Sequence, residues 1–223
     1  METNRKTAIS VGVLFLIATV IIIIGGAFSL SICETDYLTA VSTNESQVIF
    51  GALLEIIAAA AVVGIPIAMF PILKKYNESL ALGYVGARIF EGLVIFLNAI
   101  VLLSILALSQ EFVSTATPDV SYFQTSGALL LASREWISIL VDFPFTLGAV
   151  IFNYLLYQTK LTPRWLAALG LIGGTLWFAT TPLRMFSFNP EPLEFLAFPI
   201  AAQEMILAVW LIVKGFNSSE ITS

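Results

Sequence analysis

The sequence contains no histidine and only one cysteine, Cys33. Without histidine, the chain lacks the commonest metal ligand, the commonest general base near neutral pH and the usual axial ligand of haem. A single cysteine can form neither an intrachain disulfide nor a cysteine cage around a metal. These absences argue against a zinc hydrolase and against a bis-histidine cytochrome, and we expect no metal and no cofactor.

Charge is also scarce: charged residues make up 11% of the chain, and hydrophobic residues make up 58%. A soluble domain carries about 25% charged residues, so this chain has too little polar surface to face water on all sides. Its net charge of −5 argues against a nucleic-acid partner, which would need a clustered basic face. Membrane lipids are the partner that this composition predicts.

Long apolar runs account for most of the sequence. About 20 such residues cross a bilayer as a helix, and only helices and closed barrels satisfy every backbone polar group in lipid. These runs are far longer than the strands of membrane barrels. The predicted helices cover residues 7–30, 47–73, 80–108, 126–157, 164–186 and 193–213. The sequence therefore predicts an all-α, polytopic integral membrane protein, a six-helix bundle that forms one transmembrane domain over residues 1–223.

Prolines lie inside the predicted helices, among them Pro66 and Pro71 in the second and Pro144 in the fourth. Proline removes a backbone hydrogen bond and crowds the preceding turn, so each predicts a kink. The fourth helix is longer than a bilayer requires, and we expect it to protrude or tilt.

The loops differ in charge according to the side on which they lie. Basic residues occupy both termini and alternate loops: Arg5, Lys6, Lys74, Lys75, Lys160, Arg164 and Lys214. The loops of the opposite side carry acids and no Lys or Arg. Because cytoplasmic loops are enriched in Lys and Arg, this pattern predicts that both termini are cytoplasmic, which requires an even number of spans.

Several ionisable residues lie within the apolar runs: Glu55, Arg88, Glu91, Arg134, Glu135, Asp142 and Glu204. A charge at the centre of a membrane helix costs roughly 2.5–3.5 kcal/mol, so each of these residues suggests a function. The set holds two arginines and five acids, so some acids must hold a proton or meet a bound cation. The binding candidates are Glu55, Tyr84, Arg88, Glu91, Arg134, Glu135, Asp142 and Glu204.

The polar residues of the third and fourth predicted helices follow helical spacing. Tyr84, Arg88 and Glu91 lie on one face of the third helix, and Glu135 and Asp142 lie on one face of the fourth. We therefore expect the following side chains to point toward the bundle axis rather than toward lipid: Arg88, Glu91, Glu135, Asp142 and Glu204.

Depth along the helices predicts how these charges pair. Glu55 and Arg134 should lie level on the extracytoplasmic side and form one pair. Arg88 should pair with Asp142 or with Glu91, which lies one turn away on the same helix. Buried pairs of this kind can also serve only to hold helix register, with no ligand.

The sequence gives separate expectations for Glu204 and Arg184. Glu204 has no basic residue near it in its own helix, so we expect it to be protonated or to contact a ligand. Arg184, at the outer end of the fifth helix, should extend toward Glu191 or Glu194.

Three segments resemble a known family: LGYVGARIFEGLVIFL (82–97), LLLASREW (129–136) and PIAAQEMILAVWLIVKGFN (199–217). They are similar to the multi-pass bacterial and archaeal proteins called domain of unknown function 4386. The resemblance covers nearly the whole chain and implies a prokaryotic cytoplasmic-membrane protein. It implies no activity, substrate or cofactor.

The surplus of acids favours a small binding or transport protein with a polar cavity, whose partner is a small solute, a lipid, a proton or a cation. A second hypothesis is a membrane-embedded enzyme in which carboxylates supply acid–base groups. No nucleophile motif, metal-binding motif or cofactor fingerprint in the sequence supports an enzyme. A third hypothesis is a membrane sensor or accessory subunit whose charges form a purely structural network.

The topology can be tested by cysteine labelling from outside the cell in a Cys33-free background. A cysteine placed at Glu45 should react with a membrane-impermeant reagent, and one placed at Lys75 should not, because Lys75 belongs to a basic cytoplasmic loop. Reaction at position 75 without reaction at position 45 would reverse the assignment.

Overall fold

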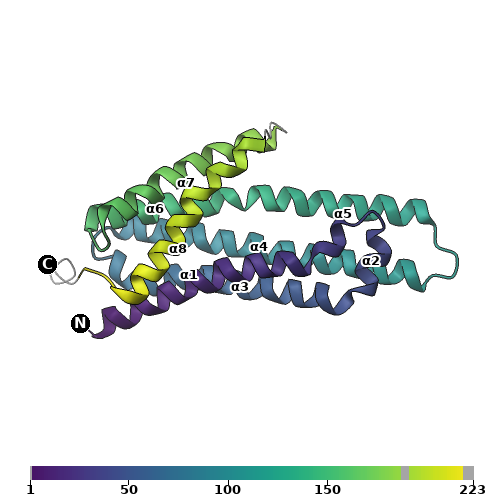
Figure 1. The fold of residues 1–223 in the computed structure, drawn as a ribbon, viewed down its shortest axis with the longest axis horizontal. Coiled ribbons are helices and arrows are strands. Elements are labelled where there is room, and N and C mark those ends of the chain that lie inside the picture. The colour runs from purple at the N-terminus through teal and green to yellow at the C-terminus, as the bar shows by residue number, and fades with distance from the viewer. Residues whose placement is uncertain (1, 187–190, 218–223) are drawn as a thin grey trace. The chain divides into compact units, whose positions relative to one another are not determined.

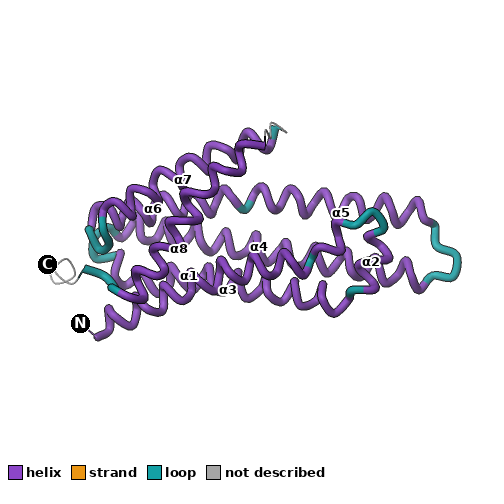
Figure 2. The backbone as a smooth tube through the Cα atoms, viewed as in Figure 1, coloured by secondary structure: helices purple, strands orange, loops and turns teal. Residues whose placement is uncertain are grey.

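The computed structural model describes residues 2–186 and 191–217, and all the regular secondary structure in these residues is helical (Figures 1 and 2). The long helices are α1 (Glu2–Phe28), α3 (Glu45–Leu73), α4 (Glu78–Ser114), α5 (Val120–Leu140), α6 (Asp142–Thr159), α7 (Arg164–Met185) and α8 (Phe198–Val213). The short ones are α2 (Tyr37–Thr43) and the 3₁₀ helices η1 (Leu30–Cys33) and η2 (Glu191–Ala197).

Six segments of the described residues are long and apolar enough to cross a membrane, as the sequence predicts. They are Asn4–Phe28, Glu45–Leu73, Glu78–Ser114, Val120–Thr159, Arg164–Met185 and Phe195–Val213. The prediction of an all-α, six-span membrane protein is therefore confirmed.

The fourth span differs from the single helix that the sequence predicts. It is 40 residues long and is interrupted at Val141, where α5 ends and α6 begins. Pro144 has no N–H, so the Leu140 carbonyl loses its intrahelical partner there. The Thr146 hydroxyl donates to the carbonyls of Asp142 (2.6 Å) and Phe143 (3.2 Å) just after the break. By contrast, α3 continues through Pro66 and Pro71.

The sixth span also differs, because its first turns are not α-helical. The expected helix at 193–213 is a 3₁₀ helix, η2, as far as Ala197, and α8 begins at Phe198. Pro199 lies in the first turn of α8, where its missing N–H costs no hydrogen bond.

The chain forms two compact units. Unit 1 consists of residues 1–17, 60–92 and 139–223, and unit 2 consists of residues 18–59 and 93–138. The helices α1, α3 and α4 each contribute residues to both units.

Unit 1 has a core of buried apolar residues from every long helix that enters it. Its members include Ala8, Leu73, Leu161 and Leu211, which lie close to the ends of four different helices. The Arg5 guanidinium donates to the carbonyls of Leu211 (3.2 Å) and Ile212 (2.6 Å). Carbonyls in the last turn of a helix such as α8 have no N–H partner within the helix, and Arg5 supplies one. The beginning of α1 and the end of α8 therefore lie on the same side of unit 1, as an even number of spans requires (Figure 1).

Close packing in unit 1 depends on small residues. In the ribbon, α6, α7 and α8 lie side by side (Figure 1). A Cβ atom on Gly173 of α7 would come within 2.6 Å of the Ile200 backbone nitrogen in α8, and one on Gly12 of α1 within 2.6 Å of the Ala208 carbonyl oxygen. Glycine at these positions lets the backbones approach closely, as is common between membrane helices.

Unit 2 has its own apolar core, which includes Val41 of α2 and Leu102 of α4. Two contacts fix the short helix α2: the Ser109 hydroxyl donates to the Leu38 carbonyl, and the Tyr37 ring packs against Gly127 of α5. Desolvation raises the pKa of the Tyr37 hydroxyl, which is buried without a hydrogen-bond partner among the described residues.

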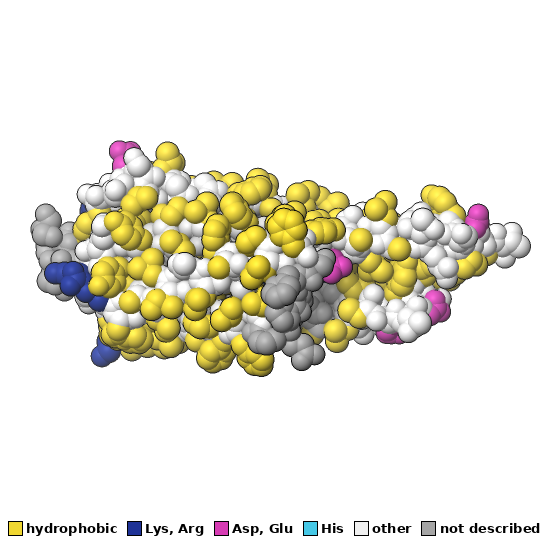
Figure 3. Space-filling model, turned by 90° about the horizontal axis from the view of Figure 1, so that it is seen from above, with side chains coloured by type: hydrophobic (Ala, Val, Ile, Leu, Met, Phe, Trp, Pro, Cys, Tyr) yellow, Lys and Arg dark blue, Asp and Glu magenta, His cyan; other side chains and the backbone are white. Residues whose placement is uncertain are grey.

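Hydrophobic side chains cover most of the face drawn in Figure 3, and its Lys and Arg side chains gather at one edge. Many large apolar residues are exposed, among them Ile23, Leu129 and Ile172, whose exposed fractions are 68%, 69% and 59%. A surface of this composition is stable against lipid and not against water.

The contact between α7 and α8 predicts the effect of a methyl group. Gly173→Ala should lower the free energy of unfolding by about 1–3 kcal/mol, because the new methyl meets backbone atoms that cannot move aside. The measurement is thermal unfolding of the purified protein in detergent.

Gly86→Ala is the matched control, since a Cβ at Gly86 meets nothing within 4 Å. It should be neutral or stabilising by up to about 1 kcal/mol, because alanine favours a helix more than glycine does. Equal stability of the two variants would contradict the packing described for Gly173.

Candidate functional site

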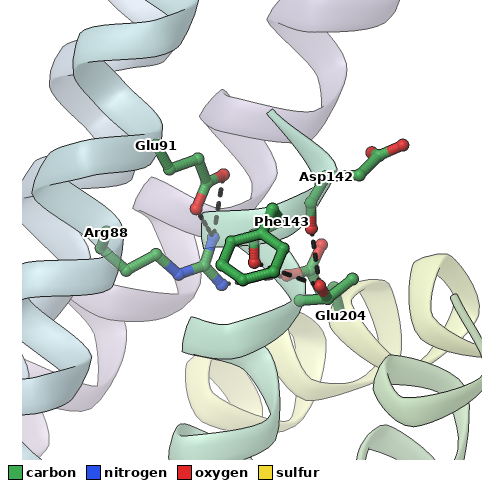
Figure 4. A network of polar contacts seen from close by, with 6 residues as sticks. Arg88, Glu91, Asp142, Phe143 and Glu204 are labelled. Carbon is green, nitrogen blue, oxygen red and sulfur yellow. Dashed lines mark hydrogen bonds and ion pairs between the residues drawn. The ribbon is translucent and has the colours of Figure 1, made fainter. Parts of the chain in front are cut away.

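A buried guanidinium in unit 1 contacts two carboxylates. Arg88 Nη1 lies 3.2 and 3.0 Å from the two carboxylate oxygens of Glu91, one turn along α4. Arg88 Nη2 lies 3.2 Å from Glu204 Oε1 in α8. Figure 4 shows the two acids approaching the same guanidinium from different helices. We call Arg88, Glu91 and Glu204 the triad.

The members of the triad differ in how far they are buried. The side chains of Arg88 and Glu91 are 3% and 6% exposed, and that of Glu204 is 14% exposed. Glu204 is also held by one hydrogen bond, whereas Glu91 accepts two. Glu204 is therefore the most accessible and least tightly held member.

Aromatic rings surround the Arg88 guanidinium. Its central carbon lies 5.5 Å from the ring centroid of Phe145, 5.7 Å from that of Tyr84 and 5.8 Å from that of Phe15. Each ring stabilises the cation through its negative face. The Tyr84 ring in turn stacks on Phe152, with the centroids 4.7 Å apart and the planes 7° apart. The sequence places Tyr84 on the same face as Arg88, and the fold uses that face to hold the cation.

A second ion pair in unit 1 joins Asp142 of α6 to Arg184 of α7. Trp177 lies beside this pair, its ring centroid 5.2 Å from the Arg184 guanidinium carbon. In Figure 4 the Asp142 carboxylate points away from Arg88 and Glu91. Asp142, which the sequence gives as one of two possible partners of Arg88, thus pairs with Arg184 instead.

The buried and half-buried ion pairs of unit 1 do not balance in charge. Two guanidinium groups, of Arg88 and Arg184, face three carboxylates, of Glu91, Asp142 and Glu204. The pair of Asp142 and Arg184 is neutral by itself, so the unbalanced negative charge belongs to the triad. A buried charge without a partner is costly, and an acid in such surroundings takes up a proton or a cation.

Uncharged polar groups extend this region. Gln203 Nε2 donates to Asn153 Oδ1 (2.9 Å), and the Asn153 amide occupies the space that a side chain at Gly170 would fill. The Gln203 carbonyl oxygen and the Tyr84 hydroxyl are buried with no hydrogen-bond partner among the described residues. Such orphaned groups are rare in a folded protein and mark places where a further polar partner fits.

Arg134 and Glu55 form a neutral ion pair in unit 2. Arg134 Nη2 lies 2.5 Å from Glu55 Oε1, and Arg134 Nη1 donates to the Asn98 carbonyl oxygen at 2.8 Å. The side chains of Arg134 and Glu55 are 12% and 10% exposed. This arrangement links α3, α4 and α5 and leaves no unbalanced charge, so it fits a structural role better than a binding site.

The predicted pairing is confirmed in part. Arg134 pairs with Glu55, as level depth predicts, and Arg88 pairs with Glu91. The alternative pairing of Arg88 with Asp142 is wrong.

The structure gives Arg184 and Glu204 partners on other helices. Arg184 contacts Asp142 of α6; the side chains of Glu191 and Glu194, toward which the sequence predicts that it extends, lie outside the described residues, so that expectation stays a prediction. Arg88 reaches Glu204 from α4, and the expectation that Glu204 holds a proton or contacts a ligand also stays a prediction.

The prediction for Glu135 is wrong. Its side chain is exposed on α5 and makes no ion pair among the described residues, whereas Arg88, Glu91, Asp142 and Glu204 are buried or half-buried. On a continuous helix Glu135 and Asp142 would share a face, but the interruption at Val141 separates them.

Sequence reasoning missed Gln203, the role of the Asn98 backbone carbonyl and the pairing of Arg184 with Asp142. Gln203 stands next to Glu204 in a strongly apolar segment, so its polarity was the available signal. Arg184 belongs to the same class of intramembrane charge as Arg88. Asn98 acts through its backbone carbonyl, for which side-chain identity gives no signal.

The pair in unit 2 allows a double-mutant cycle. Glu55→Leu and Arg134→Leu should each destabilise the protein by about 3–5 kcal/mol, because each leaves a buried charge unpaired. The double variant should recover most of that loss. The readout is thermal unfolding in detergent, and a double variant as unstable as the sum of the single ones would contradict the pairing.

Comparison with known proteins gives a family and no activity. No curated protein and no solved structure matches the chain. The family model described as "Domain of unknown function (DUF4386)" matches residues 10–215, which include both units and all the residues of the triad. Since the match extends over nearly the whole chain, this membrane protein belongs to the DUF4386 family.

Proposed function

We propose that this chain is a prokaryotic cytoplasmic-membrane protein that binds or transports a small solute or ion, and that the triad carries one exchangeable proton. The observation that carries the proposal is the unbalanced charge: a single buried guanidinium faces two carboxylates. In a low-dielectric setting one proton on the two acids restores neutrality. A group that holds a proton for this reason releases it when another positive charge arrives.

The interrupted fourth span supports the same proposal. Transporters commonly build their sites at discontinuous membrane helices, whose free backbone groups face a polar interior. Here the break at Val141 comes directly before Asp142, and the Leu140 carbonyl is freed by Pro144. Irregular backbone within a membrane is tolerated where it meets protein or a polar space rather than lipid.

Within the triad, Glu204 is the proposed site of proton exchange. It is the most exposed of the three side chains, and it makes a single hydrogen bond to Arg88. Glu91 is shielded and doubly bonded, so it serves as the fixed counter-ion of Arg88.

The second candidate function is a structural network in a sensor or accessory subunit. The neutral pairs Glu55–Arg134 and Asp142–Arg184 favour it, since each charge there has a partner. The triad is the part of the network that this alternative leaves unexplained.

Stability as a function of pH tests the proposal. In the pH range where the folded protein holds the shared proton and the unfolded chain does not, stability should fall by up to about 1.4 kcal/mol, or roughly 3–5 °C in Tm, for each pH unit. Above the pH at which the folded protein also loses the proton, the fall should level off. Glu204→Gln carries no removable proton and should abolish this dependence while the protein remains folded.

Glu78→Gln provides the control, because Glu78 is an exposed acid on α4 outside the network. It should keep the pH dependence of the unsubstituted protein. A Glu204→Gln variant with unchanged pH dependence would contradict the proposal, as would one that unfolds while Glu204→Asp stays folded without any pH response.

A further inference from the structure

We propose that the ligand which displaces the triad proton is a small monovalent cation. This inference rests on the proposed function and adds the chemical class of the ligand. It follows from the number of charges, from the kind of atoms left without partners, and from the place of Glu204 in the network.

The charges of the triad and of the pair Asp142–Arg184 select the sign and size of the ligand's charge. With all five of these groups ionised the region carries one negative charge in excess, so one positive charge balances it. An anion would add to the surplus, and a divalent cation would leave an excess of positive charge. Among charged ligands, a monovalent cation alone brings the region to neutrality, which a buried site requires.

The atoms near the triad without partners include oxygens that a cation can contact. The Tyr84 hydroxyl is completely buried and has no hydrogen-bond partner among the described residues, and its ring centroid lies 5.7 Å from the Arg88 guanidinium carbon. Glu204 uses one carboxylate oxygen for Arg88, which leaves the other available. The Gln203 carbonyl oxygen, next to Glu204 in α8, is also buried without a partner. Oxygens are the ligands that hard cations prefer.

The charged and titratable groups around Glu204 in the described part of the chain fit this exchange. Arg88, Glu91 and Tyr84 face it from α4. The pair of Asp142 on α6 and Arg184 on α7 is neutral. Binding is then an exchange in which the cation takes the place of the proton on the Glu204 carboxylate and the proton passes to solvent. No bond other than O–H breaks, and the total charge of the region stays the same.

Proton release on addition of salt tests this exchange. The purified full chain in neutral detergent and weak buffer, with a pH indicator, is titrated with NaCl, KCl or methylammonium chloride at constant ionic strength. Tetramethylammonium chloride, which has the charge without the small size, balances the ionic strength and serves as the reference.

A small cation should release about one proton per chain at saturation, because cation and proton compete for the same carboxylate. Tetramethylammonium should release none. Comparison of the sodium, potassium and methylammonium titrations distinguishes a metal ion from an organic ammonium group.

The variants decide whether Glu204 is responsible. Glu204→Gln should release no proton, Glu78→Gln should release as much as the unsubstituted protein, and Glu204→Asp should release a proton at a shifted cation concentration. Equal release from Glu204→Gln would overturn the inference, and so would the absence of release with every small cation. If no small cation releases a proton but stability still depends on pH, the inference of a cation ligand is wrong and the proposal of an exchangeable proton on the triad stands. If the pH dependence of stability is absent too, both proposals are wrong.

Discussion

The pairing of Arg88 with two acids in an apolar interior is the constraint on which the arrangement of unit 1 depends. A guanidinium does not lose its charge in a protein, so burying it requires permanent partners. Glu91 supplies one from the same helix, Glu204 supplies another from α8, and the centroids of three aromatic rings lie 5.5–5.8 Å from the central carbon of the cation. The triad therefore contains two carboxylates for one guanidinium, one acid more than charge balance requires.

That excess distinguishes the two units. In unit 2 one arginine meets one glutamate, and the result is a neutral link between helices that apolar side chains of similar volume could replace. In unit 1 the same kind of contact leaves one negative charge in excess, which an exchangeable proton or cation can neutralise. The contrast explains why the same class of intramembrane residue serves as scaffold in one unit and as the proposed site in the other.

The backbone around the triad is suited to this role. Gly173 and Gly12 let α7 and α1 pack directly on α8, and so hold Glu204 at a fixed height opposite Arg88. The break between α5 and α6 turns Asp142 toward Arg184 and leaves Arg88 to its two glutamates. Such a break frees a carbonyl, here that of Leu140, and the Thr146 hydroxyl donates to the Asp142 and Phe143 carbonyls just after it.

The sequence alone predicted the fold class, the six spans and the pair Glu55–Arg134, because hydrophobic length, depth and helical spacing are local properties. For Arg88 it gave Glu91 as one of two partners. It also identified Glu204 as unusual. Only the tertiary structure decided which helices are neighbours: that Arg184 meets Asp142, that Arg88 reaches Glu204, and that Glu135 faces outward. These contacts join residues 42 and 116 positions apart, and their geometry depends on glycine packing and on a helix break whose rotation no periodic pattern specifies.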